Sequence, residues 1–188
     1  MAEPGFPEPP STGTEIETLL GSLERQRATF WWKAADLDAS GLSHRIGASA
    51  LTLGRLLKHL AYMEDINFHR DLGGKSLPQP WADRDSDTRS TWVFTSADLD
   101  PPAVLYQTWT EAVGRSRSAV ARALTMEGPG QTFEVRGQPV SLRRLIVDMV
   151  EEYGRHTGHA DLIREAVDGR VGEDPPGLPT PYLLSNNS

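Results

Sequence analysis

Three polar residues interrupt an apolar series on the last long helical segment. The spacing between successive members of this series alternates between three and four, which places all of them on one face of a helix. The series is Leu142, Leu145, Met149, Glu152, His156, His159, Ile163 and Ala166. Burying a carboxylate and two imidazoles in such a face is costly unless each finds a partner. A divalent metal satisfies them together, because carboxylate and neutral imidazole are common ligands of zinc and its neighbours.

A second helical segment carries a matching irregularity. Its apolar series is Leu56, His59, Met63 and Ile66, in which His59 is the polar member. Two histidines and one glutamate leave a coordination position open for water or substrate. We therefore predict one divalent metal bound by His59, Glu152 and His156. Glu151 lies about 100° away around the helix and is expected not to bind it.

Other interpretations of these residues stay open. A single histidine in an apolar stripe is more often a hydrogen-bonded core residue, and a Glu–His pair four residues apart is often only a surface pair. His159 can be a ligand, a donor to a ligand, or a general base beside the metal, and we name it as the candidate catalytic residue. A two-metal carboxylate bundle needs further carboxylates on the other helices. The available ones, Glu17, Glu24, Glu64 and Asp65, fall off the relevant faces. His44 and His69 lie outside both series and are expected to be solvated.

The pattern predicts four helices, over residues 14–35, 52–72, 100–127 and 141–168. The expected N-terminal caps of the first three are Thr14, Thr52 and Asp100, with Glu17 completing a capping box, and the fourth helix is expected to begin at Ser141. A hydrophobic staple is expected between Leu99 and Val104. Residues 75–98, with Trp81 and Trp92, are expected to form a long non-helical connection. Residues 132–140 are expected to form a short hairpin. The two tryptophans can line a substrate entrance or fill the core, and we favour the core.

Bulk properties limit the class of protein. The chain has 188 residues, 38% of them hydrophobic, which suits one all-α domain. We expect a disordered tail over 1–13, a four-helix bundle over 14–172 and an extended tail over 173–188. A net charge of -7 disfavours nucleic acid, and no apolar run is long enough to cross a membrane. The absence of cysteine excludes disulfides and a cysteine nucleophile, and with the absence of a signal peptide predicts a cytoplasmic protein.

Two segments resemble the DinB superfamily. They are LTLGRLLKHL, which ends at Leu60, and EEYGRHTGHADLIREAVDG, which begins at Glu151. More narrowly, they resemble the actinobacterial branch related to mycothiol-dependent maleylpyruvate isomerase, over residues 15–172. The resemblance implies a four-helix bundle with a long crossover between its second and third helices. It also implies one zinc or nickel ion, bound by a histidine of the second helix and two groups four residues apart on the last. The isomerase relatives have Glu then His there, which corresponds to Glu152 and His156.

The function expected from residues and resemblance together is thiol chemistry at a metal. The chain would be a metal-dependent transferase or isomerase that uses mycothiol or another small thiol, with His159 accepting the thiol proton. Because the chain has no cysteine, the thiol must come from a small molecule. A metal-dependent hydrolase and a non-enzymatic metal-binding protein of the stress-response kind remain alternatives. We expect a small-molecule substrate and no nucleic-acid or membrane partner, and a homodimer stays open.

Overall fold

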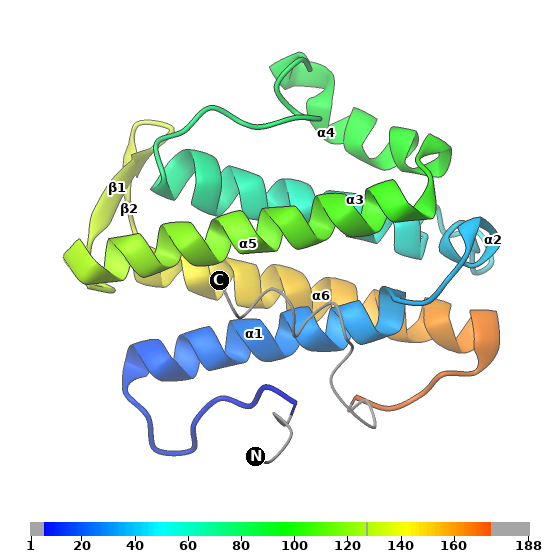
Figure 1. Ribbon diagram of the computed structural model, residues 1–188, viewed down its shortest axis with the longest axis horizontal. Helices are drawn as coiled ribbons and strands as arrows, with labels where there is room; N and C mark the ends of the chain where they lie inside the picture. Colours follow the sequence, from blue (N-terminus) through cyan, green and yellow to red (C-terminus); the bar gives the residue numbers. More distant parts are fainter. Residues whose placement is uncertain (1–5, 127, 174–188) are drawn as a thin grey trace. The chain divides into compact units, whose positions relative to one another are not determined.

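A computed structural model describes residues 6–126 and 128–173. The chain divides into two compact units, the first made of residues 1–53 and 150–188 and the second of residues 54–149. Helices dominate both units, and among the described residues the only sheet is a two-stranded hairpin (Figure 1). The predicted all-α class is confirmed. The predicted tail and domain bounds remain predictions, and residues 174–188 lie outside the described residues.

The first unit begins with helix α1, Glu15–Ala34. Its capping box is the predicted one, because the Thr14 N–H donates to the Glu17 carboxylate at 2.8 Å and the Glu17 N–H donates back to the Thr14 hydroxyl. A short helix that the sequence analysis missed, α2 (Ala39–Leu42), follows α1. Asp38 caps α2 by accepting from the Gly41 N–H at 2.9 Å.

Helix α6, Leu142–Asp168, has residues in both units, begins one residue after the predicted start at Ser141 and ends at Asp168 as predicted. The Ser141 hydroxyl accepts from the Arg144 N–H at 3.2 Å, and Gly169 has a φ of 79°. The buried face of α6 is wider than the predicted series. It also includes Ile146, Tyr153, Thr157, Ala160 and Arg164. Ala166 is exposed, so its place in the core series was wrong.

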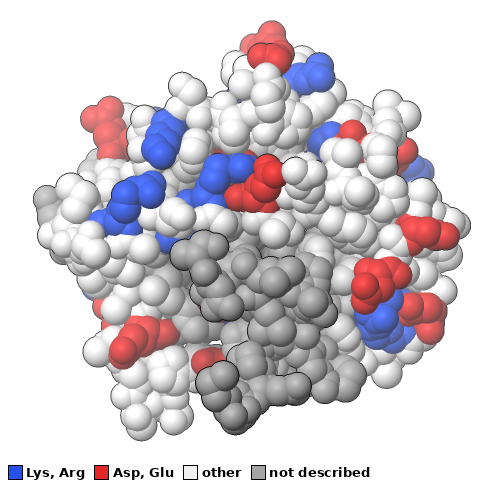
Figure 2. Space-filling view, in the orientation of Figure 1, with Lys and Arg blue, Asp and Glu red and all other residues white. Residues whose placement is uncertain are grey.

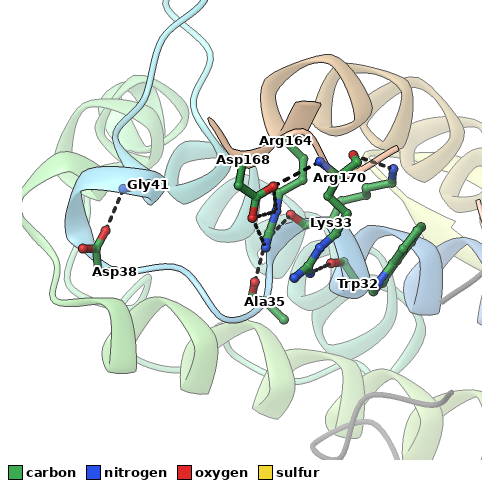
Figure 3. A network of polar contacts seen from close by, with 8 residues as sticks. All are labelled: Trp32, Lys33, Ala35, Asp38, Gly41, Arg164, Asp168 and Arg170. Carbon is green, nitrogen blue, oxygen red and sulfur yellow. Dashed lines mark hydrogen bonds and ion pairs between the residues drawn. The ribbon is translucent and has the colours of Figure 1, made fainter. Parts of the chain in front are cut away.

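Arg164 closes the first unit by joining α6 to the end of α1. Its guanidinium donates to the carbonyls of Lys33 and Ala35, at 3.1 and 2.6 Å, and to the Asp168 carboxylate at 2.8 Å (Figure 3). The last carbonyls of a helix have no partner within the helix, so these bonds satisfy groups that would otherwise be buried alone. Arg170 adds a bond to the Trp32 carbonyl at 2.9 Å.

Helix α3, Leu53–Glu64, starts directly after Thr52 as predicted, and all of it except Leu53 belongs to the second unit. It continues as η1, Asp65–Leu72, and ends at Gly73. The predicted bounds are therefore confirmed, but η1 is a π-helix, which the sequence analysis did not anticipate. Along the predicted apolar series Leu56 is fully buried, whereas His59 and Met63 are half-buried. α5 packs against η1.

The connection between η1 and α5 is not the non-helical segment that we predicted. It contains α4, Ser86–Ser96 (Figure 1), and the short 3₁₀ helix η2, Ala97–Leu99. Asp85 caps α4 by accepting from the Asp87 N–H at 3.0 Å. Only Val93 of α4 is buried, so the helix has no apolar periodicity to reveal it.

Helix α5, Pro102–Met126, starts one residue later than predicted. The carbonyl of Pro101 accepts its first hydrogen bonds, and the Asp100 carboxylate pairs with Lys58 instead of capping. The predicted staple was wrong, because Leu99 is 84% exposed.

The predicted hairpin is confirmed as β1, Thr132–Val135, paired antiparallel with β2, Gln138–Ser141. Arg136 and Gly137 connect the strands with φ values of 53° and 75°. Two successive positive φ angles are the signature of a tight hairpin turn.

Two surface observations bear on partners. No helix among residues 6–126 and 128–173 is long and apolar enough to cross a membrane. On the face drawn in Figure 2, acidic and basic side chains are intermingled, and the described residues of that face form no broad basic patch.

Candidate metal centre

Glu152 and His156 face one another on α6, in the first unit. The carboxylate oxygen Oε1 of Glu152 lies 3.3 Å from Nε2 of His156, and the two side chains are 24% and 10% exposed. Ligand distances of about 2.1 Å to a common ion would make this separation an angle of about 100° at the metal. Tetrahedral and octahedral sites both accommodate such an angle. The chemistry and spacing of this donor pair therefore fit a divalent metal.

The neighbouring Glu151 points elsewhere. Its side chain is 70% exposed and pairs with Arg155 at 3.6 Å. Glu151 and Glu152 thus differ as helical geometry predicts, one in solvent and one beside His156.

His159 lies one turn beyond His156 on the same face. Its Nδ1 is 3.3 Å from Nδ1 of His156. Burial lowers the pKa of His159, and the nearby His156 and Arg155 lower it further. A lowered pKa keeps this imidazole neutral near pH 7, with one ring nitrogen able to accept a hydrogen bond or a proton.

His59 belongs to the second unit, on α3. Its imidazole stacks on the ring of Phe94 from α4, with ring centroids 4.7 Å apart and planes inclined by 24°. A stacked ring loses rotational freedom, so Phe94 fixes the plane of the His59 imidazole. The structure thus groups Glu152, His156 and His159 within one unit and holds His59 by an aromatic contact in the other.

A comparison with known protein families identifies the family to which the chain belongs. The profile of the mycothiol-S-transferase family matches residues 18–169, most of the chain. The chain belongs to the mycothiol-S-transferase family. No curated protein and no solved structure matches it. Membership confirms the resemblance to the DinB-like branch and indicates a mycothiol-dependent transferase with a small thiol as substrate.

In this mycothiol-S-transferase family member, sequence reasoning missed the residues that hold α4 beside His59. Lys58 is almost fully buried, and its ammonium donates to the Ser96 hydroxyl at 2.8 Å and pairs with Asp100. The same ammonium lies 4.2 Å from the centre of the Trp92 ring. Lys58 thereby ties α4 to the residue preceding His59. The sequence alone does not reveal this role, because Ser96 and Asp100 lie about 40 positions after Lys58 in the chain.

The remaining candidates of the second unit are structural. Asp65 is fully buried and accepts two bonds from Arg115, at 2.8 and 2.9 Å, and one from the Trp81 indole at 2.7 Å. Trp81 is therefore core, as favoured, and Asp65 is engaged away from His59. His69 is half-buried, contrary to expectation, and burial lowers its pKa. In the first unit, His44 is exposed as expected.

Proposed function

We propose that the protein is a metal-dependent mycothiol S-transferase, in which His59, Glu152 and His156 bind one divalent ion such as zinc or nickel. Family membership supports the thiol, and the convergence of Glu152 and His156 supports the metal. The donor set consists of two imidazole nitrogens and one carboxylate oxygen. Three protein ligands leave a position for a substrate.

The metal, when bound, would supply the charge that deprotonates a thiol at neutral pH. The thiolate sulfur of mycothiol then attacks an electrophilic carbon of the acceptor. An S–C bond forms, and a leaving group departs with its electron pair or the electrons move onto the acceptor. Since the chain has no cysteine, the protein itself contributes no competing thiol.

His159 has two possible roles, and the geometry favours one of them. When Nε2 of His156 binds the metal beside Glu152, Nδ1 of His156 carries the ring proton and can donate it to Nδ1 of His159, 3.3 Å away. Ligating histidines are commonly oriented by such an acceptor on the other ring nitrogen. We therefore propose that His159 orients His156. Its expected role as acceptor of the thiol proton stays a prediction.

The variant His159→Asn separates the two roles, because an amide oxygen can accept a hydrogen bond but cannot take up the proton. If His159 orients His156, the variant keeps its metal and kcat falls by less than about tenfold. If His159 is the general base, metal content is unchanged but kcat falls by about a hundredfold or more, and the decline of kcat on the acid side of neutrality is lost, because the pKa of His159 is lowered.

The function is tested by a transfer assay with purified protein, mycothiol and the aromatic electrophile 1-chloro-2,4-dinitrobenzene. Conjugation should require zinc or nickel, stop on addition of a chelator, and be lost in Glu152→Ala. Glu151→Ala is the matched control and should retain activity. Equal rates with and without chelator would refute metal-dependent transfer. Hydrolysis of an ester or amide in the absence of any thiol would instead support the hydrolase alternative.

A further inference from the structure

The first unit contains an apolar cavity directly beside His159. Its volume is about 160 Å³. It is lined by Ile46, Ser49, Leu51, His159, Leu162 and Ile163. His159 is the residue that contacts His156 through Nδ1, so this cavity adjoins the Glu152–His156 pair within the same unit.

The loop wall of the cavity is braced by its own hydrogen bonds. The Ser49 N–H donates to the Ile46 carbonyl at 3.0 Å, and the Ser49 hydroxyl accepts from the Leu51 N–H at 3.2 Å. Gly47 completes the turn with a φ of 52°. Ser49 is therefore engaged with the loop backbone, and its role is to hold Ile46 and Leu51 in place.

Apolar side chains of both the helix wall and the loop wall are exposed at the rim of the cavity. Ile163 is buried at the floor, whereas Leu162 is 63% exposed and Ile46 is 36% exposed. Exposed apolar side chains around a hollow indicate a binding site more often than chance placement. A cavity of about 150 Å³ with aliphatic walls accepts a benzene ring.

We propose that this cavity binds the apolar, ring-sized part of the acceptor substrate. The inference rests on the proposed function, and it adds the substrate class: electrophiles that carry one aromatic or similarly sized apolar group. With that group against Leu51, Leu162 and Ile163, the reactive carbon lies toward His159 and the neighbouring metal ligands. Small polar electrophiles have no apolar group to place in the cavity, so the cavity does not raise their affinity.

The binding step is tested with fluorobenzene, an unreactive probe, followed by ¹⁹F NMR in the presence of the full-length protein. Wild type should broaden the fluorine signal. Leu162→Gln should weaken binding by about tenfold, because a ring loses contact with roughly one to two methylene equivalents. Leu162→Trp should also weaken it, because the indole occupies the cavity while keeping the surface apolar. Val147→Gln, at a half-exposed apolar position of the same helix, is the control and should bind as wild type does.

The catalytic step is tested with the same variants and two acceptors. For the aromatic acceptor, KM should rise about tenfold in Leu162→Gln, with metal content and KM for mycothiol unchanged. For iodoacetamide, a small polar acceptor, KM should be unchanged. Wild-type KM values for both acceptors in both Leu162 variants would overturn the inference and leave the proposed function intact.

Two further outcomes would separate a failure of the cavity inference from a failure of the proposed function. Absence of fluorobenzene binding to wild type, together with a change of oligomeric mass in Leu162→Gln, would overturn the inference and assign the apolar rim to contact between copies of the chain. Fluorobenzene binding as expected, in a protein that transfers no thiol to any acceptor, would support the cavity as an aromatic-binding site while refuting the proposed function.

Discussion

Helix α6 holds polar side chains in its core-facing surface at two places, and their surroundings differ. Near its end, Arg164 is buried among fixed partners, two backbone carbonyls of the α1 terminus and the Asp168 carboxylate (Figure 3). In its middle, Glu152, His156 and His159 face one another. A cation surrounded by acceptors is a complete structural contact. A carboxylate and imidazoles brought together are the donor groups of the metal site proposed above. The same helix thus carries a structural cluster around Arg164 and the proposed binding cluster of Glu152, His156 and His159.

The largest expected effect tests the structural cluster. Arg164→Met keeps the aliphatic stem but removes every donor, which leaves the buried carbonyls of Lys33 and Ala35 without those bonds. The free energy of unfolding, measured by urea denaturation, should fall by about 3 kcal/mol. Arg155→Met, which removes an exposed arginine of the same helix, should change it by less than about 0.5 kcal/mol. An equal fall in the free energy of unfolding in the two variants would mean that the contacts of Arg164 are no more important to stability than those of an exposed arginine.

The next effect tests the binding cluster through its ligand. Adding zinc or nickel at about 100 times the dissociation constant should raise the free energy of unfolding by about 2.7 kcal/mol. The gain should vanish in His156→Ala and persist in Arg164→Met, because only the first variant loses a ligand. Thermal or urea unfolding of each protein, with and without metal, measures this gain in the free energy of unfolding. If neither ion changes the free energy of unfolding of the wild-type protein, the polar residues in the middle of α6 form a hydrogen-bonded core cluster and not a metal site.

A smaller effect concerns the stacking of Phe94 on His59 in the second unit. Phe94→Ala frees the imidazole to rotate, and metal affinity should fall by about threefold to tenfold, the value of one aromatic contact. Competition with a chelating dye measures the affinity. Thr95→Ala, at the exposed neighbouring position, should leave it unchanged. Unchanged affinity in Phe94→Ala would mean that the stack does not position His59.

The smallest effect is the pH dependence of the structural cluster. The hydrogen bond from Arg164 lowers the pKa of Asp168 below its ordinary value of 3.8, and a bond from the Arg170 N–H adds to this. A lowered pKa in the folded state stabilises the protein fully at pH values above 3.8, and that contribution is lost as pH falls through the folded-state pKa. Asp168→Asn should therefore lower stability slightly at pH 7, by less than about 1 kcal/mol because the carboxylate is partly exposed. The difference in the free energy of unfolding between Asp168→Asn and wild type should become smaller below pH 4. A difference that stays constant between pH 7 and pH 4 and below would contradict this role of Asp168.

The parts of the fold that follow from local chemistry were predictable. The Thr14–Glu17 capping box, the stop at Gly169 and the hairpin over 132–140 depend on a few adjacent residues, and the structure has all three. α4 was missed because a helix with one buried residue lacks apolar periodicity. The role of Arg164 was missed because its partners, the carbonyls of Lys33 and Ala35, lie some 130 positions earlier in the chain and belong to the backbone.

The candidate site was predictable in one respect and not in another. A three–four alternation placed Glu152, His156 and His159 on one face, and the two short contacts between them confirm that face. The same alternation included Ala166, which is exposed, and overlooked Tyr153 and Thr157, because the buried stripe of α6 is wider than one seam. The support of His59 by Phe94 and of α4 by Lys58 depends on tertiary contacts that no local pattern contains.

The most direct test of the central claim is elemental analysis of the purified protein and four alanine variants. Wild type and Glu151→Ala should each carry about one zinc or nickel ion per chain, because Glu151 lies in solvent. His59→Ala, Glu152→Ala and His156→Ala should each lose most of the metal, since removing one of three ligands weakens the site severely. Equal metal content in Glu151→Ala and Glu152→Ala, or full occupancy in His59→Ala, would contradict the account.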